Sequence, residues 1–193
     1  MPQLDVLAID IPIGLPERGP RACDREARAV LGARRSSVFP APPRAVLGAT
    51  SWQQACEIRN GLEGKRISKQ TWAIVPKIRE VDDALRRVPG RSAWVREVHP
   101  EVCFWAWNGA PMKHAKKKAP GRDERLALVC RHFGTRAFSE VRDRFERCDV
   151  ADDDIVDAFA ALWTAERILR GEAVQMPSAP PLDPEGLRME IVY

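Results

Sequence analysis

The stretch LDVLAIDI, residues 4–11, decides the fold of this chain. Its apolar residues form a short run of the kind found in strands that are buried on both faces of an α/β sheet. The run must end at Asp10, because the IPIGLP that follows (11–16) contains two prolines. An aspartate at the carboxyl end of a buried strand lies where open α/β sheets bind their ligands. An Asx-turn that caps the next loop is the alternative role for Asp10.

A second strand is predicted at SAWVREVHPE, residues 92–101, which alternates and contains β-branched residues. It would place Glu101 at a strand end, with His99 beside it. Helical spacing of apolar residues predicts helices at 22–31, 51–60, 69–88, 122–133, 137–147 and 152–170. A proline-rich tail leads into LRMEIVY (187–193), a last strand or a docked extension. We therefore expect one helix-rich α/β domain over residues 1–193, with a tail and extension at 175–193.

Composition limits the class of protein and its compartment. The chain has 193 residues and a formal net charge of +4. No apolar run approaches the ~20 residues that span a bilayer, and the N-terminus does not resemble a signal peptide. Its five cysteines are scattered and show no metal-binding spacing. These features predict a cytoplasmic protein that has no membrane contact.

Five aspartates lie at the start of the helix predicted at 152–170, in DVADDDIVDAFAALWTAERIL (149–169). Negative charge is favourable near a helix N-terminus, which accounts for one or two of them. Asp157 lies one turn further in, where it shares a helix face with Asp154 and with Asp153. Hard divalent cations take oxygen ligands, so these three aspartates are candidate metal ligands. A charged cap plus one solvated acid is the alternative.

Basic residues are concentrated elsewhere in the chain. Residues 32–79 contain nine Lys or Arg against two acids, whereas 149–193 contain ten acids against three Arg. A basic tract near an acidic cluster suits a nucleic acid held over a metal site, and it equally suits two halves that attract each other. The segment MKHAKKK (112–118) can bind phosphates or be a solvated loop. The predicted nucleic-acid-binding residues are Lys65, Arg66, Lys69, Lys77, Lys113 and Lys116.

Several segments together resemble one known family. They are IDIPIGLP (9–16), RRSSVFPAPPR (34–44), GKRISKQTWAIVPKI (64–78), REVHPEVCFW (96–105), DDDIVDAFAALWTA (152–165) and GLRMEIVY (186–193). In this order they are similar to the domain of unknown function 429 family, whose members are described as predicted nucleases with an RNase H fold. The resemblance covers nearly the whole chain. It implies an RNase H-like α/β fold in which 4–11 is the fourth strand and 93–99 the fifth.

The resemblance also implies a site and a reaction. It suggests a nuclease that hydrolyses phosphodiester bonds with two Mg²⁺ or Mn²⁺ ions. Asp10, Asp154 and Asp157 would ligate metal, Glu101 and Asp153 are further candidate ligands, and His99 would shuttle protons or support a ligand. The family's earlier strands and first-strand aspartate have no counterpart before Leu4, so we expect an N-terminally truncated domain with little or no activity. The alternative is a non-catalytic protein that binds nucleic acid on the same scaffold.

The same alignment of strands predicts an open sheet edge at 4–11. A strand without a neighbour offers unpaired N–H and C=O groups to another chain. We expect one of three outcomes: a homodimer through this edge, a cover formed by the chain's own LRMEIVY segment, or poor solubility.

Overall fold

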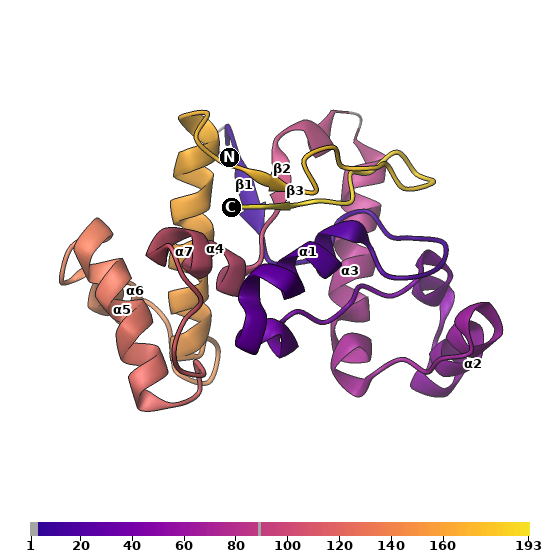
Figure 1. The fold of residues 1–193 in the computed structure, drawn as a ribbon, viewed down its shortest axis with the longest axis horizontal. Coiled ribbons are helices and arrows are strands. Elements are labelled where there is room, and N and C mark those ends of the chain that lie inside the picture. Colours follow the sequence, from indigo (N-terminus) through magenta and orange to yellow (C-terminus); the bar gives the residue numbers. More distant parts are fainter. Residues whose placement is uncertain (1–3, 89) are drawn as a thin grey trace.

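The computed structural model describes residues 4–88 and 90–193, and its fold is α/β with far more helix than strand. At its centre β1 (Leu7–Ile9) and β2 (Val95–Glu97) run parallel, with Leu7 opposite Val95 and Ile9 opposite Glu97. In Figure 1, α7 lies on one side of this pair, with α5 and α6 beyond it, and α3 and α2 lie on the other. The helices are α1 (Ala22–Leu31), α2 (Trp52–Glu63), α3 (Lys69–Arg87), α4 (Pro100–Asn108), α5 (Ala119–Phe133), α6 (Ala137–Arg142) and α7 (Asp152–Leu169). Three 3₁₀ turns connect them: η1 (Gly32–Ser37), η2 (Arg44–Gly48) and η3 (Arg91–Ala93).

The strand predicted at 4–11 is present, but it is shorter and less buried than the apolar run indicates. Ala8 packs with Val156 and Ala160 of α7, and Ile9 faces the opposite side. Leu7 remains 38% exposed, so one face of β1 is partly open to solvent. The prediction of burial on both faces is therefore wrong for the first half of the run.

The strand predicted at 92–101 is interrupted at both ends. Residues 91–93 form η3, and Pro100 begins α4, where proline is favoured in the first turn. Glu101 therefore lies in the first turn of a helix and not at a strand end. Helix α4 was not predicted, because its apolar residues are not confined to one face and so give no helical spacing. Phe104 is fully buried, and Trp107 stacks on Trp163 with ring centroids 5.1 Å apart.

The helix predicted at 137–147 ends at Arg142. The Arg142 guanidinium donates to the carbonyls of Phe145 (2.9 Å), Glu146 (3.2 Å) and Val150 (2.6 Å). These carbonyls lie in a turn that folds back around the guanidinium. A side chain thus satisfies backbone groups that helical hydrogen bonds would otherwise occupy.

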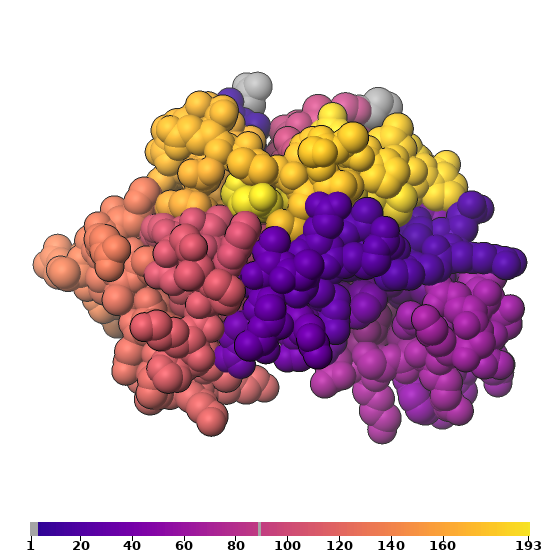
Figure 2. Space-filling model, viewed as in Figure 1, coloured from indigo at the N-terminus to yellow at the C-terminus, as the bar shows by residue number. Residues whose placement is uncertain are grey.

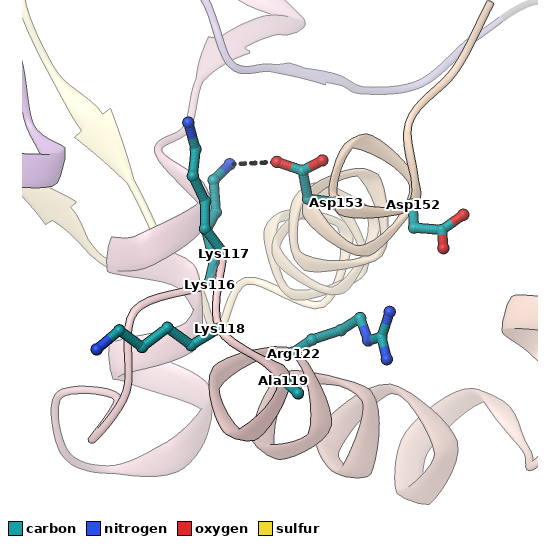
Figure 3. A pocket seen from close by; sticks show the side chains of 7 residues that line it. All are labelled: Lys116, Lys117, Lys118, Ala119, Arg122, Asp152 and Asp153. Atoms are coloured by element: carbon teal, nitrogen blue, oxygen red, sulfur yellow. Dashed lines mark ion pairs between the residues drawn. The ribbon is translucent and has the colours of Figure 1, made fainter. Parts of the chain in front are cut away.

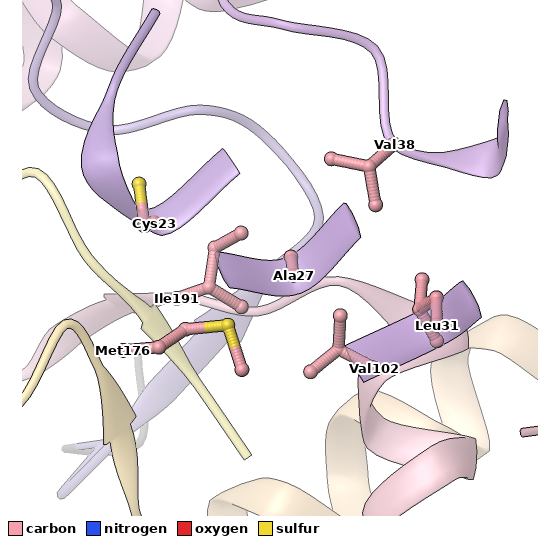
Figure 4. Close-up of a cluster of buried hydrophobic side chains, with 7 residues drawn as sticks. All are labelled: Cys23, Ala27, Leu31, Val38, Val102, Met176 and Ile191. Atoms are coloured by element: carbon pink, nitrogen blue, oxygen red, sulfur yellow. The ribbon is translucent and has the colours of Figure 1, made fainter. Parts of the chain in front are cut away.

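The C-terminal segment is built into the core. Its strands β3 (Gln175–Met176) and β4 (Ile191–Val192) pair antiparallel, and Val192 also forms a parallel bridge with Val98. Figure 2 shows the segment lying across the molecule, and Figure 4 shows Met176 and Ile191 among buried side chains of α1 and α4. Since β1 occupies one side of β2, this bridge places the segment on the other side. Of the three outcomes expected for the edge of β1, a cover formed by LRMEIVY is therefore wrong.

Candidate functional site

The carboxyl ends of the two parallel strands open into a pocket of about 570 Å³. Asp10 directly follows the last residue of β1. His99 lies two residues after Glu97, the last residue of β2. Asp157 of α7 and Lys116 of the loop after α4 line the same pocket. With Glu101, five of the residues singled out in the sequence therefore meet at the strand ends, as expected of an open α/β sheet.

Lys116 is the centre of the charged contacts at this site. Its ammonium lies 2.6 Å from one carboxylate oxygen of Asp157 and 3.6 Å from one of Asp153. Figure 3 shows Lys116 directed at Asp153 in an adjoining pocket of about 590 Å³, which Lys117, Lys118 and Arg122 also line. Lys116 and Lys117 line both pockets, so the two pockets adjoin each other.

The pocket shifts the ionisation of its carboxylates. Burial raises the pKa of Asp157 to about 6, against the opposing effect of Lys116, and Asp10 and Glu101 raise it further. Asp10 is exposed as a residue but lies in the pocket. Loss of hydration there raises the pKa of its carboxyl group, and the nearby His99 and Lys116 oppose this shift. For Lys116, burial opposes the charge, but Asp157, Asp153 and Asp10 outweigh it and raise the pKa. A cleft residue perturbed by burial and a specific charge partner is a functional candidate.

Glu101 lines the pocket but is already paired. Its carboxylate accepts two hydrogen bonds from the guanidinium of Arg125, at 2.9 and 2.5 Å, and both side chains are buried. A buried carboxylate that loses its only cation is strongly destabilised. The contacts therefore assign Glu101 a role in fixing α5 against α4.

The remaining aspartates of α7 have different roles. Asp154 is exposed and accepts a hydrogen bond from the Ala151 amide at 3.2 Å, as a residue at the start of a helix does. It lines neither pocket. Asp152 pairs with Arg142 and Arg147. The structure thus brings Asp153 and Asp157 to the site and leaves Asp154 outside it.

His99 is held by its backbone and by one ring nitrogen. Nε2 lies 3.3 Å from the carbonyl oxygen of Ser37, and since a carbonyl only accepts, Nε2 carries the proton in this contact. Nδ1 is buried and has no partner among the described residues. One ring nitrogen of His99 is therefore left without a protein partner beside the pocket.

A buried charged network in the wall of the pocket was not foreseen from the sequence. Arg21 joins Glu97 of β2 to Asp24 of α1, each at 2.7 Å, and also donates to the carbonyl of Ile13 at 2.9 Å. All three charged side chains are nearly inaccessible. Burial raises the pKa of Glu97, and Arg21 opposes that shift. The network fixes the loop after Asp10 relative to β2.

The predicted nucleic-acid-binding residues separate into two groups. Lys116 lines the pocket, whereas Lys65, Arg66, Lys69, Lys77 and Lys113 are exposed and line neither pocket. Arg66 and Lys69 lie over the Trp52 ring, 5.2 and 5.7 Å from its centroid. Gln70, the next residue of α3, lines the pocket. Three further basic residues line the pocket but were not among the predicted nucleic-acid-binding residues: Arg21, Arg34 and Lys117.

The two-cation centre that the resemblance implies does not fit these contacts. Within residues 4–88 and 90–193, no three His, Cys, Asp or Glu side chains converge as metal ligands. Glu101 is held by Arg125, Asp154 caps its helix, and Asp157 is neutralised by Lys116. Binding of Mg²⁺ or Mn²⁺ stays a prediction from the resemblance alone.

The fold and site together define a helix-rich α/β protein with charged residues at its strand ends. Residues 1–182 match the family described as "Protein of unknown function (DUF429)", and the chain belongs to this family. Searches of curated proteins and of solved structures found no match. Among the described residues, no helix combines the length and apolarity needed to cross a membrane.

Proposed function

We propose that the strand-end pocket binds the phosphodiester backbone of a nucleic acid and hydrolyses it, on a scaffold of the RNase H-like type. One observation supports this most: Asp10, His99 and Asp157 converge in one pocket from three distant segments. Packing alone does not require two partly hydrated carboxylates and an imidazole at the ends of parallel strands. Ligand sites, in contrast, regularly occupy this position.

Basic residues around the pocket support an anionic ligand. Lys117 and Arg34 line it and form no ion pair within the described chain. Lys118 and Arg122 extend the positive charge into the adjoining pocket. Such groups bind phosphates without reading base sequence, so affinity is expected to fall steeply with salt.

The chain's own side chains supply the chemistry in this proposal. Asp157, with a pKa of about 6, is ionised at neutral pH and is a base of suitable strength to accept a proton from the attacking water. The Lys116 ammonium beside it offsets negative charge that develops on the phosphate. Asp10 and His99 position the water and the ligand from the strand ends.

Binding without hydrolysis is the second candidate function. Its support is that the acids of the pocket already have internal cations, Lys116 for Asp157 and Arg125 for Glu101. In this case the carboxylates serve to position Lys116, and the basic residues alone hold the ligand.

The two candidates separate in a cleavage and binding assay with labelled DNA and RNA, single- and double-stranded. We expect Asp157→Asn to lower cleavage by about 10²–10⁴-fold, the usual contribution of a general base, while binding is retained. Asp154→Asn, on the same helix but outside the pocket, is the matched control and should cleave normally. Binding that Lys117→Ala weakens, with no cleavage by the native chain, selects the second candidate. Equal cleavage by Asp157→Asn and the native chain contradicts the assignment of the base.

A further inference from the structure

We infer that Lys116 is the resident cation of the strand-end pocket and occupies the place that a divalent metal ion would need. Its ammonium makes its shortest contact with Asp157, lies within ion-pair distance of Asp153, and lines the same pocket as Asp10. Asp10 follows β1 directly, Asp157 lines the same pocket, and Asp153 lines the adjoining one. A divalent ion bound there would have to displace the lysine and would be repelled by it at short range.

The loop before α5 is built to hold Lys116 in this position. The carboxylate of Glu124 accepts the backbone N–H groups of Lys113 at 3.1 Å and of His114 at 2.8 Å. Arg125, itself fixed by Glu101, donates to the His114 carbonyl at 3.2 Å. Lys113 and His114, which lie three and two residues before Lys116, are thus tied to α5 by the side chains of Glu124 and Arg125.

Close packing restricts the loop further. Gly121, in the first turn of α5, lies so close to the loop that a Cβ there would be 2.0 Å from the carbonyl oxygen of Ala115. The backbone next to Lys116 therefore rests directly on the helix. A loop that only exposes its lysines to solvent does not require these contacts. They are expected if the loop serves to fix the position of Lys116.

The positioning has a chemical consequence. A lysine ammonium is a compact charge with three hydrogen-bond donors, and it neutralises carboxylates without the six oxygen ligands that Mg²⁺ requires. Lys116 would hold this place whether the pocket cleaves nucleic acid or only binds it. Removing Lys116 leaves Asp153 and Asp157 without their shared cation, and uncompensated carboxylates attract hard cations.

The test is a Mn²⁺ titration of the full chain, followed by electron paramagnetic resonance of unbound Mn²⁺ and by melting temperature. We expect the native chain to show no Asp157-dependent binding at millimolar Mn²⁺. Lys116→Ala should bind Mn²⁺ at least tenfold more tightly and gain thermal stability with it, because a ligand of the folded state stabilises that state. Lys116→Arg, which keeps the charge, and Lys117→Ala, its exposed neighbour, should behave like the native chain.

A double variant identifies the ligand. Asp157→Asn added to Lys116→Ala should abolish the gained Mn²⁺ binding. Tight Mn²⁺ binding by the native chain that Asp157→Asn removes would overturn the inference, and so would a folded Lys116→Ala variant, verified by circular dichroism, that gains no binding. Neither result depends on the nucleic-acid assays, so the proposed function can fail while this inference holds.

Discussion

At the scale of single residues, the site depends on charges that share a partly dehydrated space. Asp157 is 15% exposed at its side chain and is bonded to Lys116, yet its pKa is raised to about 6, because burial outweighs the lysine. A raised carboxyl pKa means that the folded protein binds more protons than the unfolded chain between the two pKa values. The ionised carboxylate of Asp157 therefore lowers the free energy of unfolding at neutral pH. Groups with such perturbed pKa values are frequent at functional sites.

This gives a prediction about pH. The free energy of unfolding should fall as pH rises from the ordinary aspartate pKa of 3.8 to about 6, and Asp157→Asn should lack this part of the dependence. The difference between the native chain and the variant should change by at most about 3 kcal/mol over that range, at 1.36 kcal/mol per pKa unit. Urea unfolding at several pH values measures it, and the contribution of Glu97 cancels because both proteins contain it. Identical pH profiles of the two proteins would contradict the shift.

At the scale of elements, the sequence predicted those helices whose apolar residues recur at regular helical spacing. Helices α1, α2, α3, α5 and α7 lie close to their predicted ranges, because each has an apolar face with regular spacing. Helix α4 is apolar on nearly every side, so only Pro100 marked its start. Asp10, His99 and Asp157 were found because strand ends and helix faces are readable in sequence. Lys116 was predicted to bind phosphates and not to pair with Asp157, and Arg125 was not assigned at all, since contacts between residues distant along the chain leave no periodic signal.

The contact between α5 and the preceding loop can be tested through glycine. Gly121→Ala should force the loop away from the helix and lower stability by about 1–3 kcal/mol, as overpacking does. Gly61→Ala is the matched control: it lies in α2 with open space around it, and should raise stability by about 0.5–1 kcal/mol. Urea unfolding of both variants gives the comparison. Similar effects of the two substitutions would argue against the close contact.

At the scale of the whole molecule, the central sheet has one covered and one uncovered side. The C-terminal segment borders β2, with Asp183 accepting the Leu15 amide at 2.9 Å and pairing with Arg44. No described strand borders the other side of β1, and Leu4 and Leu7 beside it are 53% and 38% exposed. Exposed apolar strand edges favour pairing between chains.

We therefore predict self-association through β1. Replacing Leu4 and Leu7 by lysine should protect the edge and lower the weight-average mass at high concentration, measured by light scattering. Leu169, which is exposed on α7, is the control position, and Leu169→Lys should leave the mass of the native chain unchanged. A native chain that remains monomeric at all concentrations would contradict the prediction.

The most direct test of the strand-end pocket is nuclear magnetic resonance of the ¹⁵N-labelled chain during titration with a short single-stranded oligonucleotide. We predict that amide shifts concentrate at residues 10–12, 97–101 and 115–117 and around Asp157, and that they diminish as salt is added. Shifts confined to other surfaces, such as the turn at 143–149, would contradict the central claim, and so would a spectrum that the oligonucleotide leaves unchanged at low salt.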